Sequence, residues 1–229
     1  MYDIVYILRQ DISCSEELRY SLRTVAANFP HRKVWFFCGC PEGFKPDGSV
    51  CFSQKGRNKW QKSTSTFRWI QNAPEVSDDF WLFNDDFFIL KQVKELPYMY
   101  QDNLEDRIAK LRATRNVSGY ANCLESARDT LENAGLSTFN YALHVPMLIN
   151  KYKAIEVLDA FPNCPMFRSL YGNYWGVGGV NTKDVKITDI EKVPSQRQAL
   201  CSTSDESFKS GAVGEFIRNK FTEPSTWEV

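Results

Sequence analysis

The chain has 229 residues, of which 43% are hydrophobic and 14% aromatic, enough for the core of one large domain or two small ones. Its 28 basic and 28 acidic residues balance, which excludes an overall positive electrostatic field that would draw the protein to nucleic acid or to a membrane. A local basic groove is still compatible with this composition. No apolar run approaches the length of a membrane span and the N-terminus begins with a strand-like run rather than a signal peptide, so we expect a soluble, cytoplasmic protein.

The seven cysteines do not follow the repeated spacing of a metal site. Cys38 and Cys40 are too close in sequence for an ordinary disulfide or a standard zinc knuckle. We therefore expect mostly buried, reduced thiols, as in a cytoplasmic protein.

The first forty residues predict a strand, a helix and a second strand. Residues 3–8 are a short β-branched apolar run, and residues 33–38 form another, rich in aromatic side chains. Between them, Ser13 or Ser15 followed by two glutamates predicts the start of a helix, which Pro30 ends. Such a βαβ unit implies a parallel sheet that is covered by helices.

Residues 49–53 predict a short third strand, and residues 57–73 an amphipathic helix. The apolar run over 78–90 predicts a buried central strand that contains Asn84-Asp85-Asp86 near its middle or carboxyl end. The alternative is two strands, with the triplet as a solvated turn between them.

The second half of the chain predicts helices in the polar stretch 92–136, and then shorter elements. These are helices over 150–160 and 167–175, strands at 185–187 and 199–201, and a last amphipathic helix over 208–221. No repeat, low-complexity tract or linker interrupts the chain. We expect a single α/β domain with a mostly parallel central sheet and helices on both faces.

The Asn84-Asp85-Asp86 triplet is the strongest chemical signal. Two adjacent carboxylates in an apolar run are costly to desolvate unless something compensates their charge. A divalent cation is the usual compensation, because hard cations prefer carboxylate oxygens. Ligands of open α/β sheets bind beyond the carboxyl ends of the strands, so the triplet is where we expect a ligand.

Two further residues stand among apolar neighbours. His144 precedes Val-Pro and could be a base, a metal ligand or a phosphate partner, or else a satisfied core residue. Arg168 lies among aromatic residues, where a guanidinium is held by a carboxylate or a phosphate, or else by a structural salt bridge.

Other polar residues have both a functional and a structural interpretation. Asp205 follows a Ser-Thr-Ser run and reads as a helix start or as a further carboxylate for a metal. The remaining candidates are donors for a diphosphate or groups that could meet a nucleotide at the first strand: Asn58, Lys59, Lys62, Asp3, Arg9 and Arg19.

In chain order, residues 17–24, 83–88, 144–146 and 205–208 resemble the conserved blocks of Stealth-type sugar-phosphate transferases. The chain is even more similar to small bacteriophage glycosyltransferases, which pair the Asn-Asp-Asp block with Phe-Arg-Ser-Leu-Tyr-Gly-Asn, here 167–173, and a final Glu-Pro-Ser-x-Trp-Glu, here 223–228. Residues 6–9 read Tyr-Ile-Leu-Arg where true Stealth proteins have Trp-Val-Asp-Gly, which argues against phosphosugar transfer.

The resemblance implies a GT-A-like fold, with a nucleotide-sugar-binding βαβ half over 1–91 and a helical excursion and acceptor half over 92–229. Asp85 and Asp86 would bind Mn²⁺ or Mg²⁺ as a DxD motif does, beside Asn84. The triplet is not a strict Asp-x-Asp, so which carboxylate contacts the metal stays open. The residues expected to bind the donor are Asp3, Arg9, Asn58, Lys59, Asn84 and Asp85.

The favoured interpretation is a metal-dependent glycosyltransferase that moves a hexose from a nucleotide sugar, UDP-hexose above all, to a hydroxyl. Asp86, Arg168 and His144 would act on the donor phosphates, and Asp205 is the candidate base if the reaction inverts the sugar. One alternative is a sugar-1-phosphate transferase acting on a glycan, with His144 and Arg168 at the phosphoryl group. Another is a non-catalytic binding module with structural Ca²⁺ at the triplet.

The expected acceptor is a hydroxymethylpyrimidine of phage DNA, with a glycan or a protein as alternatives. Tyr174 or Trp175 could stack on a flipped base. The densest basic cluster consists of Arg107, Lys110, Arg112 and Arg115. The oligomeric state stays open.

Overall fold

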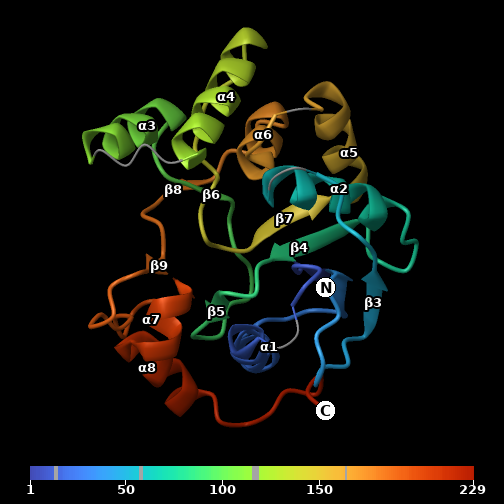
Figure 1. Ribbon diagram of the computed structural model, residues 1–229, viewed down its shortest axis with the longest axis vertical. Coiled ribbons are helices and arrows are strands. Elements are labelled where there is room, and N and C mark those ends of the chain that lie inside the picture. The colour runs from blue at the N-terminus through green and yellow to red at the C-terminus, as the bar shows by residue number, and fades with distance from the viewer. Residues whose placement is uncertain (13–14, 57–58, 115–118, 163) are drawn as a thin grey trace.

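The computed structural model describes residues 1–12, 15–56, 59–114, 119–162 and 164–229 (Figure 1). At its centre is a five-stranded sheet in the order β3-β2-β1-β4-β7. Its strands are β1 (Asp3–Ile7), β2 (Val34–Cys38), β3 (Gly48–Cys51), β4 (Asp79–Phe83) and β7 (Met147–Asn150). All neighbours are parallel except β7, which runs antiparallel to β4. The expected α/β architecture with a mostly parallel sheet is confirmed.

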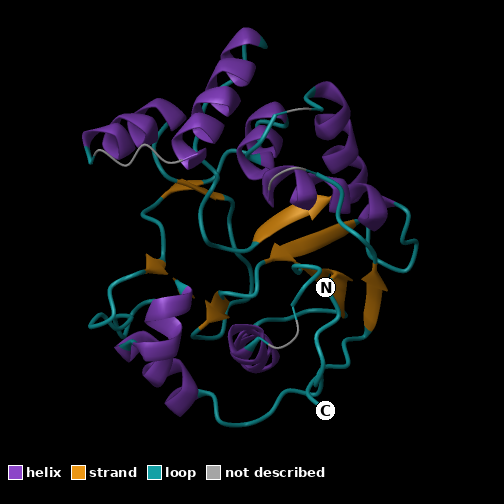
Figure 2. Ribbon diagram, in the orientation of Figure 1, coloured by secondary structure: helices purple, strands orange, loops and turns teal. Residues whose placement is uncertain are grey.

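Helices cover both faces of this sheet because alternate strand residues point to opposite sides (Figure 2). Val5 and Leu82 belong to the core that includes α2 (Lys59–Gln71), α5 (Lys151–Ala160) and α6 (Phe167–Tyr174). Tyr6 and Phe83 belong to the core that includes α1 (Glu16–Asn28) on the other side. Strands buried on both faces read as continuous apolar runs, which is how they were recognisable in the sequence.

Local signals set the ends of α1 and α5. The Ser15 hydroxyl accepts from the Leu18 N–H at 3.1 Å, and α1 ends one residue before Phe29, the neighbour of Pro30. The Asn150 side chain accepts from the N–H groups of Tyr152 and Lys153 at 3.1 Å and caps α5. The helices expected in both stretches are therefore present.

The single strand expected over 78–90 is wrong, and the two-strand alternative is right. β4 ends at Phe83, and β5 (Phe87–Ile89) belongs to a second, three-stranded sheet in the order β5-β10-β9. In that sheet β10 (Leu200–Thr203) runs antiparallel to β5 and parallel to β9 (Lys186–Ile187). The triplet forms the turn between the two sheets, as short polar side chains allow.

The last helix expected over 208–221 is also wrong, because the chain forms two helices, α7 (Asp205–Ser210) and α8 (Ala212–Lys220). They are divided at Gly211. A Cβ atom there would lie 2.5 Å from the Ser207 carbonyl oxygen and 3.0 Å from that of Ile190, so only glycine fits this close approach.

The polar stretch after β5 contains the expected helices, α3 (Leu104–Ala113) and α4 (Gly119–Asn133). The short strands β6 (Met99–Tyr100) and β8 (Val180–Asn181) pair beneath them. Leu104 and Leu124 join the same core as Val5, so the helical pair belongs to one continuous domain. Within the described part of the chain, no helix has both the length and the apolar character needed to cross a bilayer.

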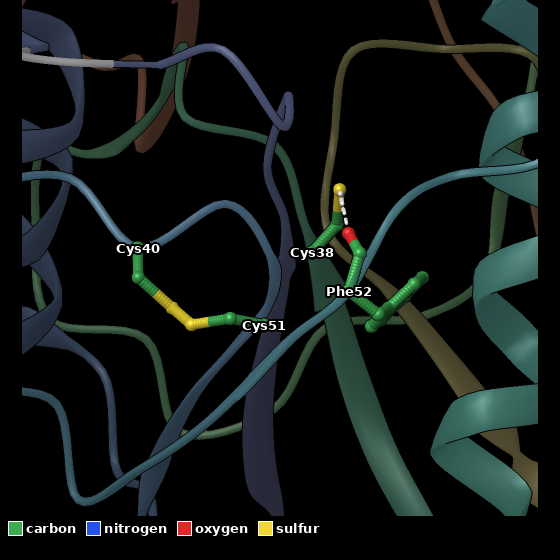
Figure 3. Close-up of a disulfide and its surroundings, with 4 residues drawn as sticks. All are labelled: Cys38, Cys40, Cys51 and Phe52. Carbon is green, nitrogen blue, oxygen red and sulfur yellow. Dashed lines mark hydrogen bonds between the residues drawn. A yellow bond between two sulfur atoms is a disulfide. The ribbon is translucent and has the colours of Figure 1, made fainter.

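The expectation of mostly buried, reduced thiols is wrong for one pair of cysteines. Cys40 and Cys51 form a disulfide between the loop after β2 and the end of β3 (Figure 3). In the register of these strands Cys51 faces Cys38, and Cys40 lies two residues beyond the end of β2. Cys38 itself is buried, and its thiol contacts the Phe52 carbonyl oxygen at 3.5 Å.

Candidate active site

A cleft of about 1260 Å³ opens at the carboxyl ends of β1 and β4. This is the edge of a parallel sheet where ligands are expected. The sequence-predicted residues that line it are Arg9, Lys62, Asn84, Asp85, Asp86, His144, Arg168 and Asp205. Residues separated by more than a hundred positions in the chain thus meet around the acidic triplet.

Asp86 is held from one side only. Its Oδ2 atom accepts from Lys186 Nζ at 3.1 Å and from Ser202 Oγ at 3.0 Å, both on the second sheet. Its Oδ1 atom is buried and has no hydrogen-bond partner within the described part of the chain. Burial and the adjacent charge of Asp86 raise the pKa of Asp85. A buried, unpaired acceptor beside a second carboxylate costs free energy that a cation would recover.

Glu17 is a site residue that the sequence did not reveal. It lines the cleft from the first turn of α1, and its carboxylate accepts from Thr203 Oγ1 at 2.8 Å. Burial, with the charges of Asp85 and Asp86, raises the pKa of Glu17 to about 7, although the Thr203 hydrogen bond opposes this. In the sequence, Glu17 looks like any acidic residue that favours a helix N-terminus.

The carboxylates suit an open metal site rather than a closed one. Among the described residues, no three His, Cys, Asp or Glu side chains are arranged to enclose a metal ion. Mg²⁺ retains several waters and takes only one or two carboxylates together with substrate phosphates. Asp85 and Asp86, with the unpartnered Oδ1 atom, fit that requirement.

Arg168 lines the cleft and contacts three other segments of the chain. Its guanidinium donates to the carbonyl oxygens of Val145 and of Leu82 and lies over the Phe87 ring at 5.3 Å. Burial lowers the pKa of Arg168 to about 10, against the opposing effect of Asp86 and Asp184. Neither a salt bridge nor a phosphate is needed to hold it, because backbone carbonyls at the end of β4 and beside His144 do so.

His144 is oriented by Asp184, a second residue that sequence reasoning missed. His144 Nδ1 lies 2.7 Å from Asp184 Oδ2, and its backbone N–H donates to Oδ1 of the same carboxylate at 3.1 Å. The His144 side chain is 33% exposed, so it is not the satisfied core residue of the alternative interpretation.

Asp3 is wrong as a nucleotide contact. It starts β1, at the opposite end of the strand from the cleft, and is fully buried. Its carboxylate accepts from Arg32 at 2.6 and 2.7 Å and from Trp35 Nε1 at 3.0 Å. Arg19 is likewise committed elsewhere, to Glu228 at 2.7 Å. Asn58 and the Lys59 side chain lie outside the described residues.

Of the aromatic and basic residues expected to contact DNA, those that the structure describes do not line the cleft. Tyr174 Oη donates to Glu156 and Trp175 Nε1 to the Lys153 carbonyl oxygen, so both pack against α5. On α3, Lys110 pairs with Asp102 and Arg112 with Glu125, which neutralises part of the predicted cluster. Arg107 also lies on α3, and Arg115 lies outside the described residues.

No protein-family model and no curated protein matches the sequence. Among solved structures, the chain is similar to the galactosyltransferase LgtC in complex with donor and acceptor sugar analogues, with a TM-score of 0.38, 12% identity, and coverage of 74% of this chain and 68% of that one. It is also similar to the glycosyltransferase GlyE of Streptococcus pneumoniae TIGR4, with a TM-score of 0.34, 8% identity, and coverage of 96% of this chain and 49% of that one. This chain thus spans about half the length of GlyE. The side chains of the cleft, and not these similarities, carry the functional conclusion.

Proposed function

We propose that the protein is a metal-dependent glycosyltransferase that moves a hexose from a nucleotide sugar, with UDP-hexose as the favoured donor, to a hydroxyl acceptor. The observation that carries this proposal is the pair Asp85 and Asp86 at the end of β4, facing a cleft of about 1260 Å³, with one buried carboxylate oxygen unpartnered. That volume exceeds what a single small-molecule ligand needs and leaves room for donor and acceptor together.

Asp85 and Asp86 would hold Mn²⁺ or Mg²⁺ against the diphosphate of the donor. The metal, when bound, supplies Lewis-acid stabilisation of the charge on the leaving nucleoside diphosphate. Lys186 and Ser202 hold the Oδ2 atom of Asp86, so that the carboxylate keeps one orientation, with the buried Oδ1 atom unpartnered among the described residues. Arg9 and Lys62 line the same cleft and offer cationic donors for phosphate oxygens.

For the acceptor we propose a hydroxyl compound. A hydroxymethylpyrimidine of phage DNA stays a prediction, and a glycan remains the alternative. DNA binding needs cations that are available for backbone phosphates. Lys110 and Arg112 are ion-paired on α3, so this cluster does not support the DNA acceptor.

A second candidate function is sugar-1-phosphate transfer. It is favoured by the position of His144 and Arg168 in the same cleft as the acidic pair, where they could act on a phosphoryl group. The two reactions differ in the nucleotide that they release. Glycosyl transfer releases a nucleoside diphosphate, whereas phosphosugar transfer releases the monophosphate.

The released nucleotide therefore tests the proposal. The protein is incubated with Mn²⁺ and a panel of UDP-, GDP- and dTDP-hexoses, and the nucleotides are separated by chromatography. We expect release of the nucleoside diphosphate from one donor. Asp86→Ala should lower the rate of this release on the order of 100-fold or more, because it removes a proposed ligand of the metal that stabilises the leaving-group charge. Asp159→Ala, an exposed aspartate on α5, is the matched control and keeps the activity. Monophosphate release favours the second candidate, and no release from any donor contradicts both.

A further inference from the structure

The His144–Asp184 contact is built more firmly than a chance surface pair. One carboxylate holds both the ring, through Nδ1 at 2.7 Å, and the backbone N–H of the same histidine, at 3.1 Å. Asp184 lies in the loop between β8 and β9, forty residues further along the chain. His144 lines the cleft, whereas Asp184 is not among the described residues that line it. The carboxylate therefore backs the ring, and the ring faces the ligand space.

This contact decides which ring nitrogen carries the proton. Burial alone would raise the pKa of Asp184, but its hydrogen bonds with the ring and the backbone N–H of His144 and with the backbone N–H of Lys186 outweigh burial and lower it. An ionised carboxylate only accepts hydrogen bonds, so Nδ1 must be the protonated nitrogen. Nε2 is then left with its lone pair.

Neighbouring elements fix the segment that carries His144. Arg168 on α6 donates to the carbonyl oxygen of Val145, the next residue. Among the described residues, Arg168 and Tyr120 of α4 interact electrostatically with Asp184. Lys186 of β9 lines the same cleft as His144, and its backbone N–H donates to Asp184. Asp184 therefore holds both the ring and the backbone N–H of His144, and Arg168 holds the backbone of the next residue, Val145.

We propose that His144 is the general base for the acceptor hydroxyl and that Asp184 is its positioning residue, an inference that rests on the proposed glycosyl transfer. Nε2 of His144 takes the hydroxyl proton while the acceptor oxygen forms a bond to the anomeric carbon. The bond from that carbon to the phosphate oxygen breaks, and its electron pair leaves with the nucleoside diphosphate. A single displacement of this kind inverts the anomeric configuration. Asp205, the base expected from the sequence, lines the same cleft from an exposed position on α7, and the proposal assigns the role of base to His144 instead.

The tautomer of His144 tests the geometry without any substrate. The chain has only two histidines, so His31→Gln leaves the His144 ring as the sole imidazole signal in a long-range ¹H–¹⁵N correlation spectrum. His31 contacts the Phe29 carbonyl oxygen and the Trp227 ring, which are not part of the cleft. We expect a neutral ring protonated on Nδ1. A ring protonated on Nε2 overturns the proposal.

Asp184→Asn changes the hydrogen-bonding groups at this position without changing the shape of the side chain. Its oxygen still accepts from the His144 backbone N–H, while its NH₂ group donates to Nδ1 and forces the proton onto Nε2. We expect the ring of His31→Gln/Asp184→Asn to be protonated on Nε2 instead of Nδ1. The melting temperatures of this variant and of His31→Gln, measured by thermal unfolding, check that both are folded. An unchanged tautomer overturns the proposal.

Kinetics separate a positioning role from a merely structural one. With the donor found in the panel above, Mn²⁺ and water as acceptor, we expect Asp184→Asn to lower kcat on the order of 10²- to 10⁴-fold, with little change in KM for the donor. We expect an acid limb in the wild-type pH–rate profile and its loss in Asp184→Asn. His144→Gln should lower kcat by a similar factor. The double variant His144→Gln/Asp184→Asn should lower it no further, because the two residues act as one unit. Unchanged kcat and pH profile in Asp184→Asn, or a sugar product of retained configuration, overturn the base assignment while leaving glycosyl transfer intact. A wild-type protein that consumes no nucleotide sugar contradicts the proposed function itself.

Discussion

Glu228, next to the last residue, ties the end of the chain to α1. Its carboxylate accepts from Arg19 Nη1 at 2.7 Å, from Arg23 Nε and Nη2 at 2.8 Å, and from the Ser225 N–H at 2.7 Å. Burial raises the pKa of Glu228, but these hydrogen bonds outweigh it and lower the pKa to about 2. The same helix presents Glu17 to the cleft at its first turn, so the tail supports an element of the site.

The first stability prediction concerns this carboxylate. Glu228→Gln should lower the free energy of unfolding by about 2 kcal/mol at pH 7, because charge-assisted hydrogen bonds to two arginines are weakened. A depressed carboxyl pKa contributes stability above its unfolded value of 4.5, and this contribution is lost as the pH falls towards 2. The difference between wild type and variant, from urea unfolding at several pH values, should therefore shrink over that window. A difference that stays constant contradicts the assignment.

At the scale of single residues, the sequence indicated some site residues and not others. Asp85 and Asp86 could be found because two acids interrupt an apolar run, which is a local anomaly. Glu17 and Asp184 stand among polar neighbours and look like ordinary surface acids. Their importance comes only from partners far along the chain, Thr203 and His144, which no local pattern reveals.

Among the elements, β2 and β3 form the edge of the main sheet that the disulfide closes. Cys40 and Cys51 are separated by eleven positions, and the loop between them begins with Pro41 and reaches β3. Both residues are exposed, so a reductant has access to the bond. The bridge holds the start of the segment that carries Gln54 to the cleft.

Loss of this bond should destabilise the fold. For a closed loop of this length, chain entropy predicts a loss of about 3 kcal/mol in the free energy of unfolding for Cys40→Ala/Cys51→Ala. Unfolding in denaturant with and without dithiothreitol measures it. The reductant should destabilise wild type by a similar amount and leave the double variant unchanged. Equal stability of wild type in both buffers would show that the cysteines are not bridged.

The elements divide into those that follow from local pattern and those that tertiary contacts decide. α1 and the first two strands have clear caps, breakers and periodicity, and were predicted nearly to the residue. The break between β4 and β5 was only the alternative to a single strand, because the apolar pattern is continuous on both sides of the triplet. β5 leaves the main sheet since it pairs with β10, more than a hundred residues later.

The molecule combines a main sheet covered on both faces, a three-stranded sheet backed by α7 and α8, and the short β6–β8 pair (Figure 1). Residues of the main sheet's carboxyl edge and of the three-stranded sheet line the cleft together. The main sheet contributes Arg9 and the acidic pair at its carboxyl edge. The smaller sheet contributes Lys186 and Ser202, which both donate to the Oδ2 atom of Asp86. A ligand in this cleft would therefore lie against residues that follow the main-sheet strands and against Lys186 of the smaller sheet.

The most direct test of this account is a calorimetric titration of the folded protein with UDP, with and without Mn²⁺. We predict that Mn²⁺ strengthens UDP binding to wild type, and that Asp86→Ala reduces this metal-dependent gain on the order of 10- to 100-fold. Asp159→Ala should bind as wild type does. UDP affinity that is the same in wild type and Asp86→Ala, and indifferent to Mn²⁺, would contradict the claim that the acidic pair binds a metal–nucleotide complex.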